Sequence, residues 1–406
     1  MLKASRTQPY ILVADQLIDG DGCCLPAGSA LRIQDGKIAD IGVVDDMKSE
    51  GVSVLTAPGS SVMPGLIDCH GYLSVDPDRP DPMGGMHGED LVERAWLTAK
   101  HLSQDLESGV TTMRVMGEGQ NMDLRAKDAI EQGILRGPRL LCSGAPICPS
   151  FSHQAPPNGG ADGVEGVRRA VRMAIADGVD WIKLLATGGV NAPGDRATTT
   201  LYSPGEIDAV FEECRRTETP VAVAAHGGTS IRQCAAQGTR TFEHCAFFDD
   251  DALEISAEAR VTLVLTLARF FLPNGIERSG KDVPGVPERL QRAREYLTAL
   301  VPKAIDRGAS IVLGTDNMHG GLPLDAIEFV RLGASPKQAI SALTGEAAAT
   351  LSLSNEVGHL KVGMRADLAI LDGNPLADIR HIAATVAVIR DGLVAVGIDN
   401  LHRTAS

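Results

Sequence analysis

Five polar residues stand in or directly after short apolar runs, and their side chains could together bind a metal ion. They are His70, Lys183, His226, His244 and Asp316. One histidine at such a position is usually a hydrogen-bonded structural residue, but five buried polar groups all need partners, and an unpaired buried charge is costly. Imidazole nitrogens and a carboxylate suit a divalent cation such as Zn, Mn or Co. The set therefore predicts a metal site.

The lysine needs a separate explanation, because a protonated ammonium group would repel a cation. Lys183 lies in the apolar run DWIKLLATGG, where burial favours the neutral amine by lowering its pKa. A neutral lysine can react with carbon dioxide to form an anionic carbamate, whose two oxygens can bridge metal ions. We therefore predict a carbamate on Lys183.

The elements that must position these residues form a repeating pattern between residues 64 and 355. Apolar runs of strand length alternate with stretches such as LVERAWLTAKHLSQDLESG and PGEIDAVFEECRRTE, whose apolar residues recur at helical spacing. The eight candidate strands are GLIDCH, VTTMRVM, RLLCSGA, WIKLLAT, VAVAAH, RTFEHC, VTLVLTL and SIVLGTD. This order predicts an α/β fold, a (β/α)8 TIM barrel, in which the five polar residues converge on the active-site face.

The two ends of the chain have a different sequence pattern. Residues 1–63 alternate short β-type runs with turns, and the same pattern returns in residues 356–406, with an Asp-Gly turn between two short strands. We expect both ends to meet in one small composite β-sandwich domain beside the barrel of residues 64–355.

Composition excludes several functions for this chain of 406 residues. The net charge of −14 argues against binding to nucleic acid or to an anionic membrane surface. No apolar stretch is long enough to span a membrane. The eight cysteines form no CxxC pair, and the first residues lack the apolar run of a signal peptide, so a reducing, cytoplasmic location is expected.

Several motifs together resemble the amidohydrolase superfamily, in particular its prolidase-like and imidazolonepropionase-like branch. They are VMPGLIDCHGYL, SGVTTMRVMG, RGPRLLCSGAPI, DWIKLLATGG, VAVAAHGGTSIRQCAAQGTRTFEHCAFFDDDAL, VLGTDN and GHLKVGMRADLAILDGNPL. The resemblance implies a metal-bearing barrel with a small β-sandwich, and a hydrolase of amide or related C–N bonds. By position, Lys183 matches the carbamylated lysine, His226 and His244 match two histidine ligands, and Asp316 matches the catalytic aspartate. It also implies a homo-oligomer.

The first strand departs from this family pattern. The family usually ends that strand with His-x-His, whereas this chain has His70-Gly71-Tyr72. Residues two apart on a strand point the same way, so Tyr72 is expected where the second histidine would lie. A phenol, with an ordinary pKa of ~10, is a poor ligand at neutral pH. One or two metal ions per chain are possible in this family pattern, and the sequence favours one.

The expected mechanism is attack of a metal-activated water on a carbonyl carbon. Asp316 would accept the proton of the water and pass it to the leaving nitrogen, and the hydroxyl of Tyr72 or an imidazole would hydrogen-bond the oxyanion. Residues near the strand ends could contact the substrate, although each also has a plain structural interpretation. They are His153, Gly188, Gly189, Arg269 and His319, with His87 as a further ligand candidate.

The sequence leaves the substrate open. The main interpretation is hydrolysis of an N-acyl, dipeptide, urea or carbamate-like small molecule. The same activated water would serve a cyclic-amidine deaminase or a lactone hydrolase. Because Tyr72 replaces an expected ligand, a catalytically impaired, ligand-binding or structural homologue is the alternative from another class.

Overall fold

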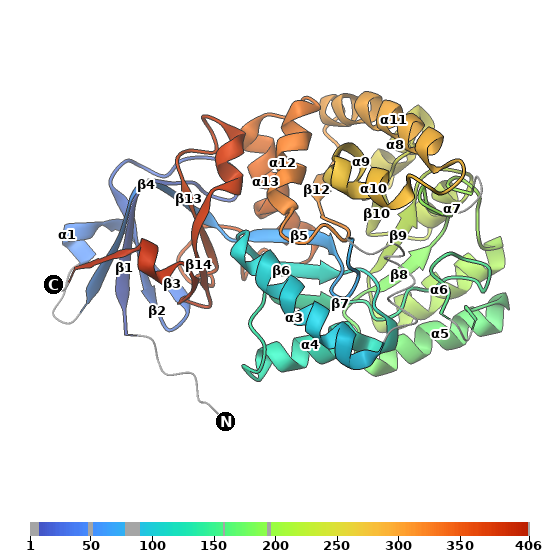
Figure 1. The fold of residues 1–406 in the computed structure, drawn as a ribbon, viewed down its shortest axis with the longest axis horizontal. Helices are drawn as coiled ribbons and strands as arrows, with labels where there is room; N and C mark the ends of the chain where they lie inside the picture. Colours follow the sequence, from blue (N-terminus) through green and yellow to red (C-terminus); the bar gives the residue numbers. More distant parts are fainter. Residues whose placement is uncertain (1–7, 48–51, 78–89, 157–158, 193–195, 405–406) are drawn as a thin grey trace.

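The computed structural model describes residues 8–47, 52–77, 90–156, 159–192 and 196–404. It contains one large sheet, in the order β15-β14-β13-β4-β1-β2-β3 with β16 paired to β4, and this sheet lies to the left in Figure 1. Its strands come from both ends of the chain: β1 (Tyr10–Leu17), β2 (Ser29–Gln34), β3 (Lys37–Val43), β4 (Ser53–Pro64), β13 (Leu368–Asp372), β14 (Thr385–Arg390), β15 (Leu393–Val396) and β16 (His402–Thr404).

Asp-Gly turns join two strand pairs of this sheet, as the sequence predicts. Asp35-Gly36 connects β2 to β3, and Asp391-Gly392 connects β14 to β15; all four residues have a positive φ. Positive φ at both central residues is the requirement of a type I′ hairpin turn, which matches the twist of the flanking strands. The two ends of the chain thus share one sheet, while the exact domain boundaries at residues 63/64 and 355/356 stay a prediction.

All eight strands predicted between residues 64 and 355 are present, and every pair among them is parallel. Three form one sheet: β5 (Leu66–Gly71), β6 (Val110–Val115) and β7 (Arg139–Cys142). Five form another: β8 (Ile182–Leu185), β9 (Val221–Ala225), β10 (Thr241–His244), β11 (Thr262–Leu265) and β12 (Ile311–Leu313). Single parallel bridges, Ile147 to Leu184 and Gly71 to Asp316, connect the two sheets at both edges.

Helices follow most of these strands and cover them on the outside (Figure 1). The longer ones are α3 (Leu91–Glu107), α4 (Met122–Glu131), α5 (Gly163–Asp177), α6 (Pro204–Thr217), α8 (Asp250–Glu258), α11 (Val286–Asp306), α12 (Leu322–Arg331) and α13 (Pro336–Leu343). Helix α6 begins where the sequence directs it: Ser203 and Glu206 form a capping box, and Pro204 occupies the first turn. The part of the chain that the structure describes contains no helix that is long and apolar enough to cross a membrane.

Candidate functional site

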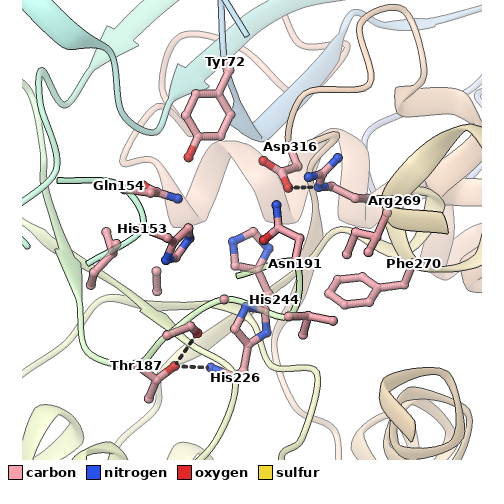
Figure 2. Close-up of a pocket in the computed structure, with 16 residues that line it drawn as sticks. Tyr72, His153, Gln154, Thr187, Asn191, His226, His244, Arg269, Phe270 and Asp316 are labelled. Atoms are coloured by element: carbon pink, nitrogen blue, oxygen red, sulfur yellow. Dashed lines mark hydrogen bonds and ion pairs between the residues drawn. The ribbon is translucent and has the colours of Figure 1, made fainter. Parts of the chain in front are cut away.

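A pocket lies at the carboxyl ends of the parallel strands, and seven loops supply its walls (Figure 2). Its ionisable lining residues are Tyr72, His153, His226, His244, Arg269 and Asp316. They follow or end strands β5, β7, β9, β10, β11 and β12. Of the five residues predicted to converge, His226, His244 and Asp316 line this pocket, while His70 packs against His244 and Lys183 is bonded to Tyr72 of the lining.

Three histidines form a row of packed rings, and two of them, His226 and His244, line this pocket. The ring centroids of His70 and His244 are 4.6 Å apart, and those of His226 and His244 are 5.2 Å apart. Burial first, then neighbouring ionisable groups, holds the pKa of all three imidazoles well below 6.5, so they are neutral. The Nε2 atom of His70 and the Nδ1 atom of His226 are buried without a hydrogen-bond partner. Neutral imidazoles with unused nitrogens are suitable metal ligands.

Lys183 lies beside this row, on β8, and is almost completely buried. Its Nζ donates a hydrogen bond of 2.8 Å to the hydroxyl of Tyr72 and a second one to the carbonyl oxygen of Met116. Burial lowers the pKa of Lys183 to about 8, so the neutral amine is accessible near neutral pH. Burial also raises the pKa of Tyr72 well above 10, which keeps the phenol protonated.

The carboxylate of Asp316 is paired with the guanidinium group of Arg269. The Nε of Arg269 forms an ion pair with Oδ2 of Asp316, and the same guanidinium donates from Nη1 to the side chain of Asn317. Arg269 is only 4% exposed, so this pair is largely removed from water. Arg269 thus forms the structural ion pair that is the plain interpretation of this residue, and it also lines the pocket, so its predicted contact with a substrate stays a prediction.

The backbone is strained at two of the candidate residues. His244 has a φ of 71° and Asp316 a φ of 59°, both in the left-handed region that residues with a side chain seldom adopt. Such conformations cost about 1–3 kcal/mol each and are concentrated at functional sites. The strain at His244 also interrupts the regular alternation of β10, so that Glu243 and His244 both contact residues of the site.

Beneath the pocket lies an ionic network that sequence reasoning missed. Glu243 accepts from Nδ1 of His70 at 2.7 Å and from Nη2 of Arg114 at 2.8 Å, and all three side chains are fully buried. Strict alternation along RTFEHC would have placed Glu243 on the side opposite to His244. The available signal was a charged residue inside each of two apolar strands, because such residues need buried partners.

The predicted substrate residues divide into two groups. His153, Gly188, Gly189 and Arg269 line the pocket, whereas His319 does not. A Cβ at Gly188 would lie 2.4 Å from the backbone carbonyl oxygen of Arg196, so this position requires glycine, whereas one at Gly189 would lie 2.8 Å from Nε2 of His153, a side-chain atom that would have to shift. Burial lowers the pKa of His153 to about 4, which leaves a neutral ring at the pocket wall.

His319 points away from the pocket, and His87 lies outside the described residues. Nε2 of His319 lies 3.0 Å from the carbonyl oxygen of Val75, and Nδ1 lies 3.3 Å from Oδ2 of Asp105. Gly320, the next residue, donates its N–H to Oδ1 of Asp105 at 2.6 Å. These contacts hold the loop after β12 against α3, so His319 connects these two segments and does not line the pocket.

The donor chemistry fits a divalent cation, although no complete cage of ligands is preformed. Within the described ranges, no group of three or more His, Cys, Asp or Glu side chains is arranged to hold a metal ion. Two pairings occupy candidate ligands: Asp316 is paired with Arg269, and the amine of Lys183 is bound to Tyr72. The unused nitrogens of His70 and His226 are nevertheless groups that a bound cation would satisfy.

Comparisons with known proteins agree with this chemistry. The sequence profile described as "Amidohydrolase family" matches residues 61–395. Ochratoxinase of Aspergillus niger is 30% identical over 412 residues, which cover 93% of this chain and 84% of the relative. An imidazolonepropionase of Symbiobacterium thermophilum is 26% identical over 400 residues, which cover 86% and 85%.

Solved structures give the same result. A Xaa-Pro dipeptidase with methionine bound in its active site superposes with a TM-score of 0.85 at 26% identity, covering 95% of this chain and 99% of the other. The structure of A. niger ochratoxinase has a TM-score of 0.83 at 28% identity, with 96% of each chain covered. These similarities support a hydrolase that acts on C–N bonds.

Proposed function

The chain belongs to the amidohydrolase family, and on that premise we propose that it is a metal-dependent hydrolase of an amide-type C–N bond in a small molecule. N-acyl compounds, dipeptides, ureas and carbamate-like compounds are the substrate classes. The observation that carries this proposal is the row of neutral, buried histidines beside Lys183, with Asp316 lining the same pocket. The similarity to an ochratoxinase and to a Xaa-Pro dipeptidase supports it.

The proposed scaffold is a (β/α)8 barrel made from the two parallel sheets, next to a small β-sandwich that contains both chain ends. The single bridges between Ile147 and Leu184 and between Gly71 and Asp316 support this arrangement, because they connect the sheets in the order of a closed ring. In such a barrel the pocket would lie at the carboxyl-terminal face, where enzymes of this architecture carry their active sites.

His70, Lys183 as a carbamate, His226, His244 and Asp316 are the residues that would hold the cation. Zn, or alternatively Mn or Co, would supply Lewis acidity and lower the pKa of a bound water. Asp316 would accept a proton from the attacking water and deliver it to the leaving nitrogen. Arg269 would fix the orientation of the Asp316 carboxylate, and the hydroxyl of Tyr72 would hydrogen-bond the developing negative charge.

We further propose one metal ion per chain rather than two. Tyr72 stays a neutral phenol, and Asp316 is neutralised by Arg269, so a second position beside His70 would lack free anionic ligands. The ligands of the single ion would then lie on the side of Lys183, His226 and His244, and the unpartnered Nε2 of His70, whose ring lies 4.6 Å from that of His244, would be a further nitrogen ligand for the same ion. Elemental analysis of protein purified without added metal is expected to give one equivalent, and a reproducible second equivalent would contradict the proposal.

A substrate screen tests the activity itself. Amide, dipeptide, urea, carbamate, cyclic-amidine and lactone compounds would be assayed for released amine, ammonia and acid. Amine release from the first four classes supports the proposal, whereas ammonia from amidines or acid from lactones supports the alternative hydrolases. If neither bound metal nor turnover is found, a ligand-binding or structural role is the better conclusion. The ion pair between Asp316 and Arg269 would then explain the lack of activity, because it occupies the carboxylate that the reaction needs.

The proposed homo-oligomer is tested separately, by measuring the mass of the protein in solution.

A further inference from the structure

The buried ionic network of Arg114, Glu243 and His70 joins the two parallel sheets through the carboxylate of Glu243. Glu243 lies on β10, while His70 lies on β5 in the other parallel sheet, yet Oε2 of Glu243 and Nδ1 of His70 are 2.7 Å apart. Both side chains are completely buried. Water therefore cannot replace either partner, and the two groups determine each other's hydrogen-bonding state.

The oxygens of Glu243 act as acceptors toward every neighbour. Nη2 of Arg114 donates to Oε1 at 2.8 Å and to Oε2 at 3.0 Å, and the hydroxyl of Thr241 donates to Oε1. A carboxylate paired with a guanidinium in this way only accepts hydrogen bonds. The contact to His70 must therefore use an N–H, so the proton of the neutral imidazole resides on Nδ1.

A rigid support keeps this carboxylate in place. The guanidinium of Arg114 stacks 4.5 Å from the ring of Trp181, donates from Nε to the carbonyl oxygen of Cys69 at 2.6 Å, and donates from Nη1 to Thr241 at 3.1 Å. Trp181, Arg114 and Glu243 come from or adjoin three different strands. This support prevents Glu243 from rotating away from His70.

We propose that Glu243 is a positioning residue that locks His70 in the Nδ1–H tautomer, so that the lone pair of Nε2 is kept free for a cation in the pocket. The unpartnered, buried Nε2 of His70 is the atom that this arrangement leaves available. The role of the free Nε2 as a metal ligand rests on the proposed metal-dependent function, whereas the hydrogen bond between Glu243 and His70 does not depend on it. A hydrogen bond from a ligand's second nitrogen fixes both tautomer and ring orientation.

The structure specifies the variant that reverses this state. In Glu243→Gln, the amide oxygen is expected at the Oε1 position, because Thr241 and the shorter of the two Arg114 contacts donate there, while the longer Arg114 contact reaches Oε2. The amide NH2 then faces Nδ1 of His70, which must accept, and the proton moves to Nε2. The variant changes a tautomer with almost no change of side-chain volume.

The test measures the imidazole nitrogens of the full-length protein, as purified, by NMR of protein labelled with 15N-histidine. The chain has ten histidines, and His70→Asn identifies the signals of His70 by their loss. We expect a protonated Nδ1 in the wild type and a protonated Nε2 in Glu243→Gln. Competition with a chelator should show about 10–100-fold weaker metal binding by that variant.

Thr344→Val is the matched control, because it removes a fully buried threonine hydroxyl that donates to the carbonyl oxygens of Gly20 and Ile340, away from Glu243 and the pocket. It should lower stability and leave both the tautomer and the metal affinity unchanged. A wild-type His70 protonated on Nε2, a proton that stays on Nδ1 in Glu243→Gln, or an equal loss of metal affinity in Thr344→Val would overturn the inference.

The wild-type measurement decides the question even if Glu243→Gln does not fold. A wild type without metal and without turnover would refute the proposed function, while the NMR result would still decide the role of Glu243.

Discussion

At Asp316, the carboxylate that the proposed reaction needs is held by Arg269 and by a strained backbone. Asp316→Asn keeps an oxygen that can accept from Arg269 but loses the ability to take a proton. Turnover is therefore expected to fall by about 10²–10⁴-fold, while the metal content changes little; the melting temperature should fall, because the buried guanidinium of Arg269 loses its anionic partner. Steady-state kinetics, calorimetry and elemental analysis of the same preparation check this. Wild-type turnover in the variant would remove Asp316 from the mechanism.

The Tyr72 hydroxyl is a hydrogen-bond partner of a buried lysine, which gives Tyr72→Phe a predictable cost. Lys183 would lose the acceptor that now lies 2.8 Å from its Nζ. The free energy of unfolding should decrease by about 1–3 kcal/mol, because a buried polar group is left with one partner fewer. Urea unfolding measures this loss.

Tyr202→Phe is the matched control for that experiment. The hydroxyl of Tyr202 donates to the carbonyl oxygen of Ala161 at 2.9 Å, a bond between uncharged groups at a partly buried position. Its removal is expected to cost about 1 kcal/mol or less. If Tyr72→Phe proves no more destabilising than Tyr202→Phe, the Tyr72 hydroxyl is not the partner of Lys183 that the structure indicates.

At the scale of elements, His319 joins three segments: the loop after β5, helix α3 and the loop after β12. Both ring nitrogens face acceptors, the carbonyl oxygen of Val75 and the carboxylate of Asp105, so the protonated ring fits this position. The ring also stacks on His101, with centroids 3.7 Å apart. Burial alone would lower the pKa of His319, but Asp105, the carbonyl oxygen of Val75 and the charge of Glu118 together outweigh it, and the pKa is raised above 6.5.

This raised pKa determines how the stability contributed by His319 varies with pH. The folded state binds the proton more tightly than the unfolded chain, so the contribution is fully present below pH 6.5 and is lost as the pH rises through the folded-state pKa. His319→Gln should therefore cost more free energy of unfolding at pH 6 than at pH 9. Urea unfolding of wild type and variant at both values measures the difference, and an equal cost at both would contradict the prediction.

The strands and their polar ends were predictable, because an apolar run that stops at a histidine or aspartate is a strong local signal. His70, His226 and His244 came from that signal and lie together. The pairings between side chains were not predictable. Which carboxylate Arg269 contacts depends on how two loops approach each other, and the loss of alternation at His244 depends on a left-handed backbone that no residue type in RTFEHC requires.

At the scale of the whole molecule, Arg139 connects the parallel strands to the large sheet. It belongs to β7, and its Nη2 contacts Asp367, directly before β13, at 3.1 Å and Asp391, in the turn between β14 and β15, at 2.9 Å. The side chain of Asp367 is 1% exposed. The sequence predicted that both chain ends share a domain, but no sequence pattern indicates that Arg139 contacts Asp367 and Asp391 across two separate sheets.

Arg139→Met tests how much this connection stabilises the fold. The substitution keeps much of the apolar volume but leaves the buried Asp367 without its cation, so the free energy of unfolding should decrease by about 2–3 kcal/mol. Arg365→Met is the matched control, since Arg365 contacts the same Asp391 at 2.9 Å from a more exposed position, and it should cost about 1 kcal/mol or less. Adding Asp367→Asn to Arg139→Met should recover part of the loss, because the neutral amide removes the unpaired buried charge. Urea unfolding of these variants gives the comparison, and equal costs for the two arginine variants would show that the Arg139 pair is worth no more than a surface contact.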